Sequence, residues 1–143
     1  MKSLSAQYVI TNTGRPLKRA VITTEDDGTI INIEDTTGTL REKHSTEFYN
    51  GIIVPGFVNS HCHPELSHLI SILEELKTLQ LNFQDIPLED LVSWATINGE
   101  KGLGAQDRFG IIEPGKKPGL LLIENVDLQN MKLLPESTVR RLI

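Results

Sequence analysis

The sequence is short of several features that define common classes of protein. It holds a single cysteine, Cys62, so no disulfide can form within the chain, which fits a reducing compartment such as the cytosol. No run reaches the roughly 18 apolar residues of a membrane span, and the N-terminus lacks the apolar core of a signal peptide. The formal net charge is −5 and no basic stripe is visible, so we expect neither nucleic acid nor a membrane as a partner.

What is present has the composition of one globular domain. Its 143 residues, 38% hydrophobic and 23% charged, are enough to bury roughly two-thirds of the unfolded surface. The sequence Asp26-Asp27-Gly28 predicts a hairpin turn, because glycine accepts positive φ without a Cβ clash. Runs rich in β-branched residues, separated by glycine and proline turns, predict a small sandwich or barrel with strands at 7–11, 20–24, 29–33, 46–49, 52–55, 110–112 and 119–123.

The middle of the chain has helical periodicity instead. Ser71 to Glu74 matches a capping box, which predicts that a helix begins at Ser71. Apolar residues then recur at helical spacing over 72–83, and a second stripe follows Pro87, which suits a first helical turn. We interpret both stripes as core-packing faces rather than cofactor sites, and expect them to fold back on the sandwich or to associate with another copy. Pro135–Ile143 reads as a short capped helix.

The chain is organised around the stretch GIIVPGFVNSHCH at 51–63, which reads as a turn, a short apolar strand and two histidines. Side chains at i and i+2 of a strand share a face, so His61 and His63 would aim both imidazoles at one point while Cys62 turns away. Neutral imidazole is a common zinc ligand, and two convergent rings are half of a tetrahedral site. The alternative is that the pair are two surface residues at a strand end. Cys62 fits a structural thiol better than a nucleophile.

Residues 55–63 resemble the first barrel strand of the amidohydrolase superfamily, and within it most closely the deaminase and chlorohydrolase branch. Residues 94–104 and 107–123 resemble that family's last helical turn and its return into a β-sandwich domain. The resemblance implies a metal-dependent hydrolase of C–N bonds, with zinc or iron as the cofactor and a small molecule as the substrate. It also implies that the N- and C-terminal segments together build one β-sandwich beside the barrel.

A complete (β/α)₈ barrel needs about 200 residues or more, and no such length separates the two matches. The four histidines stand at 44, 61, 63 and 68, so nothing downstream supplies the family's later metal ligands. We therefore interpret the chain as an amidohydrolase without its barrel, the two ends joined near 69–71. The expected fold is α+β: a small composite β-sandwich from 1–60 and 105–130, two or three inserted helices as a barrel remnant at 61–104, and a tail or short helix at 131–143.

Other polar residues are weaker candidates. Glu65 and His68 follow the motif where the resemblance implies substrate-facing residues, although in this chain a loop or helix start also explains them. His44 fits a solvated loop. Two functions remain open for the chain: part of a metal-dependent hydrolase, or a catalytically empty structural domain. Since the resemblance supplies only two metal ligands, His61 and His63, we assign no catalytic residue and expect no hydrolase activity and no tightly bound metal.

Overall fold

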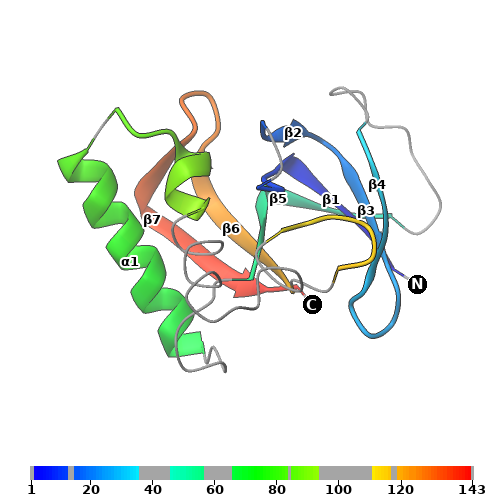
Figure 1. Cartoon of the computed structure of the whole chain (residues 1–143). Helices are drawn as coiled ribbons and strands as arrows, with labels where there is room; N and C mark the ends of the chain where they lie inside the picture. Colours follow the sequence, from blue (N-terminus) through cyan, green and yellow to red (C-terminus); the bar gives the residue numbers. More distant parts are fainter. Residues whose placement is uncertain are drawn as a thin grey trace.

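The computed structural model describes residues 2–12, 15–35, 46–56, 66–83, 85–93, 111–116 and 119–142 (Figure 1). These residues form a mixed sheet of seven strands and two helical segments, which confirms the predicted α+β class. In chain order the elements are β1 (Lys2–Val9), β2 (Leu17–Lys18), β3 (Val21–Thr24), β4 (Ile30–Glu34), β5 (Thr46–Pro55), α1 (Leu66–Asn82), β6 (Leu120–Asp127) and β7 (Lys132–Arg141). A second, short helical segment spans 88–93.

The sheet joins the two ends of the chain. Its strand order is β4-β3-β1-β5-β6-β7, and β2 pairs with β1 outside this path. The β1–β5 pair is parallel and every other pair is antiparallel. Strand β5, from the N-terminal part, pairs directly with β6, from the C-terminal part. The expected composite β-structure of N- and C-terminal segments is therefore confirmed.

The central strands bury apolar side chains on both faces. Alternate residues of β5 and β6 enter two separate clusters, as the two-residue period of a strand requires. We call the first the helix-side core: Ile10, Ile52, Val54, Leu73, Leu76, Leu88, Leu91, Val92, Leu121, Ile123, Leu133 and Val139. We call the second the opposite core: Leu4, Ala6, Val9, Ala20, Ile22, Ile30, Ile53, Ile112, Leu120 and Leu122.

The turn between β3 and β4 follows the prediction. Gly28 has φ 93°, a value that glycine adopts without a steric cost. The Asp27 carboxylate accepts a hydrogen bond from the Thr29 amide at 2.9 Å, so the aspartate serves the turn. On the other side of β4, Ile30 donates to the Lys116 carbonyl and accepts from the Gly115 amide, both at 2.8 Å.

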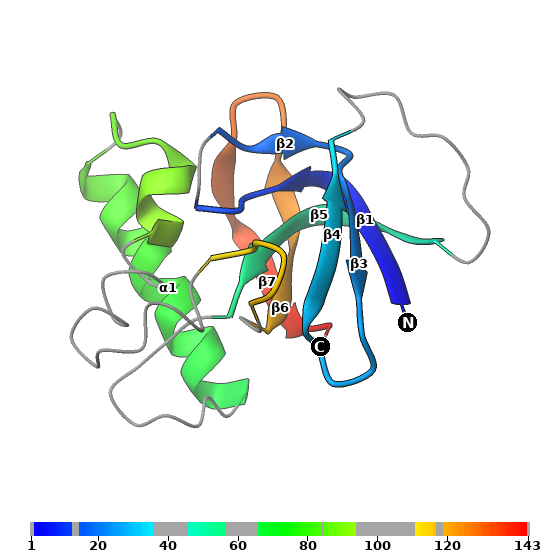
Figure 2. The ribbon, with the colours of Figure 1, turned by 45° about the vertical axis from the view of Figure 1, so that its right-hand side comes forward.

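The helices fold back on the sheet, one of the two outcomes expected from their stripes (Figures 1 and 2). The predicted start at Ser71 is wrong, because α1 already begins at Leu66 and Ser71 lies inside it. Phe83, the last residue of the stripe expected over 72–83, is 54% exposed and lies just beyond the end of α1. Pro87 does precede a helical turn, because its carbonyl accepts from the amides of Asp90 and Leu91.

The C-terminal segment is a strand, so the short helix predicted over Pro135–Ile143 is wrong. Val126 pairs with Leu133 and Glu124 with Thr138, so the segment 134–137 bulges opposite the single residue Asn125. A bulge accommodates proline, which has no amide to give to a ladder. The Ser137 hydroxyl closes this bulge by accepting from the Leu134 amide and donating to the Asn125 carbonyl.

Two strand predictions near the motif also need correction. Residues 46–49 and 52–55 form one continuous strand, β5, and Gly51 lies inside it rather than in a turn. Residues 111–113 are not in a strand, although the Ile112 amide donates to the Thr11 carbonyl at 3.0 Å. Gly110, the first residue of that predicted strand, lies outside the described residues.

Candidate functional site

Strand β5 leads toward the histidine motif from the centre of the sheet. It pairs with β6 from Ile52, opposite Ile123, to Pro55, opposite Leu120. The next residue, Gly56, donates its amide to the Gly119 carbonyl at 3.1 Å. This bond extends the β5–β6 pairing by one step beyond Pro55 and Leu120.

The residues of the predicted metal site lie mostly beyond this point. His61, Cys62, His63 and Glu65 are outside the described residues, and so is His44. His68 lies in α1, but its side chain is also outside the description. The convergence of the two imidazoles therefore stays a prediction. Within the described ranges, no group of three or more His, Cys, Asp or Glu side chains could hold a metal ion.

Gly51 fixes the path of β5 toward the motif. Its φ is 147°, and a Cβ built on it would lie 2.3 Å from the Ile123 carbonyl oxygen. The β1–β5 register shifts at the same level, between Ala6 and Tyr8. Only a residue without a side chain lets β5 approach the β6 backbone this closely while the pairing with β1 changes register.

Segment 111–116 connects distant parts of the sheet. Ile112 is 1% exposed in the opposite core, and its amide bonds to the Thr11 carbonyl just after β1. The two hydrogen bonds with Ile30 tie the far end of the same segment to β4. The described part of 107–123, the stretch that resembles the return into the β-sandwich domain, thus supplies side chains to the opposite core and hydrogen bonds to the sheet.

Helix α1 is attached to β7 by polar side chains as well as by apolar packing. The Gln80 carboxamide donates to the Leu133 carbonyl and accepts from the Leu133 amide, each at 2.8 Å. The Lys77 ammonium donates to the Pro135 carbonyl at 2.9 Å and pairs with the Glu74 carboxylate. Our sequence analysis missed both residues, and no motif marks them, because their role depends on which strand ends up beside the helix.

A small charged network lies across β5, β6 and β7. The Tyr49 hydroxyl donates to the Glu47 carboxylate at 2.5 Å, and this bond raises the pKa of Tyr49, with burial adding to the effect. The Arg140 guanidinium lies 5.3 Å from the centre of the Tyr49 ring, and its Nε is 3.0 Å from Glu124. The network joins three strands. The Tyr49 hydroxyl and the Glu47 carboxylate are already bonded to each other, so neither is positioned for acid–base chemistry.

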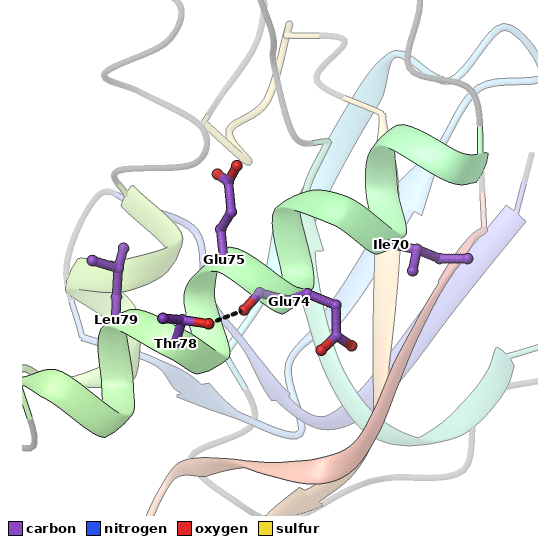
Figure 3. Close-up of a pocket in the computed structure, with 5 residues that line it drawn as sticks. All are labelled: Ile70, Glu74, Glu75, Thr78 and Leu79. Carbon is purple, nitrogen blue, oxygen red and sulfur yellow. Dashed lines mark hydrogen bonds between the residues drawn. The ribbon is translucent and has the colours of Figure 1, made fainter.

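The surface of α1 is slightly hollowed. An open depression of about 590 Å³ is lined by Ile70, Glu74, Glu75, Thr78 and Leu79 (Figure 3). In Figure 3 the carboxylates of Glu74 and Glu75 point in different directions, and the Thr78 hydroxyl donates to the Glu74 carbonyl of its own helix. These side chains diverge, so the depression does not form a site for an ion or a polar ligand.

No helix among the described residues is long and apolar enough to cross a membrane.

Comparison with known proteins gives one sequence relative and several weak structural likenesses. The chain is 35% identical over 65 residues to an imidazolonepropionase from Picrophilus torridus, a match that covers 46% of this chain and 16% of the relative. No family model matches. The resemblance to the amidohydrolase superfamily is confirmed. The aligned part spans about one-sixth of that relative, so the relative's activity does not transfer directly to this chain.

Three solved structures give low overall superposition scores. They are A. niger ochratoxinase (16% identity, TM-score 0.32, covering 49% of this chain and 19% of the other), an amidohydrolase from Brucella melitensis (15%, 0.34, 65% and 22%) and N-acetyl-D-glucosamine-6-phosphate deacetylase from Mycobacterium smegmatis (16%, 0.35, 76% and 32%). At these scores the likenesses support no conclusion about this chain.

Proposed function

We propose that this chain is the β-sheet part of a metal-dependent amidohydrolase-like enzyme of the deaminase or chlorohydrolase type, in which His61 and His63 supply two metal ligands. The observation that carries the proposal is the hydrogen bond between Gly56 and Gly119. This bond lies at the end of the β5–β6 pair, and the histidine motif follows Gly56 in the sequence.

A junction of this kind suits the insertion of a domain. The two ends meet across one antiparallel strand pair, so the cost of closing the intervening chain grows only slowly with its length. A barrel of about 200 residues in the place of 61–104 would leave the pairing of β5 with β6 unchanged. In this proposal 1–60 and 105–130 are the composite domain, and 61–104 stands where the barrel would be.

The donor chemistry of the motif fits zinc or iron, since imidazole binds both, but it fills only half of a site. When bound, such a metal would supply Lewis-acid activation of water. His61 and His63 would hold it, and Glu65 and His68 would face the substrate. A metal site of this class normally takes three or four protein ligands, so we propose that this chain alone binds metal weakly and has no hydrolase activity.

The alternative is a structural or interaction domain with no enzymatic role. One observation favours it: α1 and the segment 88–93 already cover the helix-side core with Leu73, Leu76 and Leu91, each at most 3% exposed. A sheet covered in this way has no bare apolar face on that side for a barrel to occupy. The two functions differ in whether the histidine pair binds metal at all.

Titration calorimetry with Zn²⁺ tests the proposal. We compare the parent chain with the double variant H61A/H63A and with H44A, a matched control that removes a histidine from outside the motif. The proposal predicts weak binding that H61A/H63A abolishes and H44A retains. Binding that survives in H61A/H63A, or the absence of binding in the parent, supports the structural alternative instead. Sub-micromolar affinity or turnover of an amidine or amide substrate would refute the proposed incompetence.

A further inference from the structure

The dipeptide Asn50-Gly51 lies inside β5. In such a dipeptide the glycine nitrogen can attack the asparagine side-chain carbonyl, because glycine has no side chain to hinder the approach. A bond forms between the Gly51 nitrogen and Cγ of Asn50, the bond from Cγ to the side-chain nitrogen breaks, and ammonia leaves with the proton of the Gly51 amide. Water then opens the succinimide ring to aspartate or to isoaspartate, in which the main chain runs through the former side chain.

The two residues of this dipeptide differ in their surroundings. Asn50 is exposed, whereas Gly51 is buried. The register of β1 with β5 shifts here, so that Asn50 and Gly51 both lie opposite the single residue Gln7 and form a bulge in β5. The Asn50 side chain is therefore open to water, and lack of solvent does not protect the site.

The main chain at Gly51 is held in place instead. A Cβ built on Gly51 would lie 2.3 Å from the Ile123 carbonyl oxygen, so the β6 main chain is close on this side. The next residue, Ile52, pairs with Ile123 of β6 and with Tyr8 of β1. Ring closure turns the Gly51 nitrogen toward the Asn50 side chain, out of the extended conformation of a strand. This rotation disturbs the pairing on both sides, so it requires β5 to open.

We propose that Asn50-Gly51 is a deamidation site that the folded β5 protects and the unfolded chain exposes, and that isoaspartate formed there prevents refolding. Isoaspartate adds one carbon to the main chain, about 1.5 Å of extra length. Ile52, Ile53 and Val54 follow directly, and each is 0% exposed. The added carbon displaces these three side chains along β5 and breaks their register with β6. Prolonged unfolding thereby becomes irreversible.

The test incubates the full chain at neutral pH in native buffer and in concentrated guanidinium chloride. Peptide mapping by mass spectrometry, with detection of isoaspartate, gives the conversion at residue 50. The second Asn-Gly pair of the sequence, at 98–99, is the reference for the chemistry in denaturant. The matched control Asn50→Gln keeps a carboxamide at this position but needs a larger, slower-forming ring, and Asn50→Asp carries the aspartate product with a main chain of normal length.

The proposal predicts that residue 50 converts at least tenfold more slowly in native buffer than in denaturant, where it keeps pace with residue 98. Equal rates in the two conditions overturn the protection, and no conversion in denaturant overturns the site.

After the denaturant is removed, chains with isoaspartate at residue 50 should remain unfolded by circular dichroism. Asn50→Asp and equally incubated Asn50→Gln should refold. Refolding of the isoaspartate chains overturns the block. Failure of Asn50→Asp to refold shows that the charge is sufficient to block folding, and failure of incubated Asn50→Gln shows that damage elsewhere is responsible; either result overturns the role of main-chain lengthening at residue 50.

Discussion

The centre of the sheet and its β7 edge are built by different interactions. At the centre, β5 and β6 bury apolar side chains on both faces, and the tight fit is made by main chain against main chain at Gly51. At the edge, single polar side chains bind main-chain groups instead. Ser137 bridges the two sides of the bulge, and Gln80 binds both the amide and the carbonyl of Leu133. We therefore expect an added atom to be most harmful at Gly51 in the centre, and a lost hydrogen bond to be most harmful at the edge.

The largest effect is expected for Gly51→Ala. The new Cβ would lie 2.3 Å from the Ile123 carbonyl oxygen, and φ 147° is unfavourable for any residue with a side chain. Strain and overpacking together should cost about 3 kcal/mol or more, or prevent folding. Urea unfolding followed by circular dichroism measures the loss.

Gly115→Ala separates the two causes. Gly115 also has a positive φ, +87°, but a Cβ there meets nothing within 4 Å. Its substitution should cost only about 1 kcal/mol, the price of the backbone conformation. If Gly51→Ala and Gly115→Ala cost the same, the close approach of β5 to β6 is not what requires glycine at 51.

The centre was also the part that the sequence predicted best. The continuous apolar runs at 52–55 and 119–123 predicted the central strands, and Asp26-Asp27-Gly28 predicted the turn before β4. These predictions succeed because they depend only on local sequence. A continuous apolar run favours a buried strand, and a turn is determined by adjacent residues.

The edge was predicted worst, for a physical reason. Pro135-Glu136-Ser137 reads locally as a helix start, yet the same proline and serine suit a bulge once β6 lies beside them. The pattern at Ser71 likewise matched a cap although the helix begins earlier. Polar side chains act through partners distant in sequence, and local pattern does not contain those partners. The histidine pair at 61 and 63 is a local motif, and its geometry stays a prediction.

A medium effect is expected for Ser137→Ala at the edge. Ser137 is 3% exposed, and its hydroxyl accepts from the Leu134 amide at 2.8 Å and donates to the Asn125 carbonyl at 2.7 Å. Its removal leaves two main-chain groups unpaired and should cost about 1–3 kcal/mol in urea unfolding.

Thr24→Val is the contrasting variant for that experiment. The Thr24 hydroxyl is equally buried but has no hydrogen-bond partner among the described residues, so an isosteric methyl should be neutral or stabilising. Equal losses for the two variants would show that hydroxyl burial alone, rather than the bridging of the bulge, determines stability.

The smallest effect concerns the turn between β6 and β7 and depends on pH. The Asp127 carboxylate accepts from the Asn130 side chain at 2.9 Å and from the Asn130 amide at 3.2 Å, and these bonds lower the pKa of Asp127, the side-chain bond most. A lowered folded-state pKa favours the ionised form. The stabilisation is therefore present above the unfolded-state pKa of about 3.9 and is lost as pH falls through the folded-state value. Asn130→Ala removes the side-chain donor and should move the pKa of Asp127 upward, as measured by NMR titration of its carboxyl carbon. Asp127→Asn should lose less stability than the parent between neutral and acidic pH. An unchanged Asp127 titration in Asn130→Ala would mean that the turn, unlike the bulge at Ser137, does not depend on a side-chain hydrogen bond.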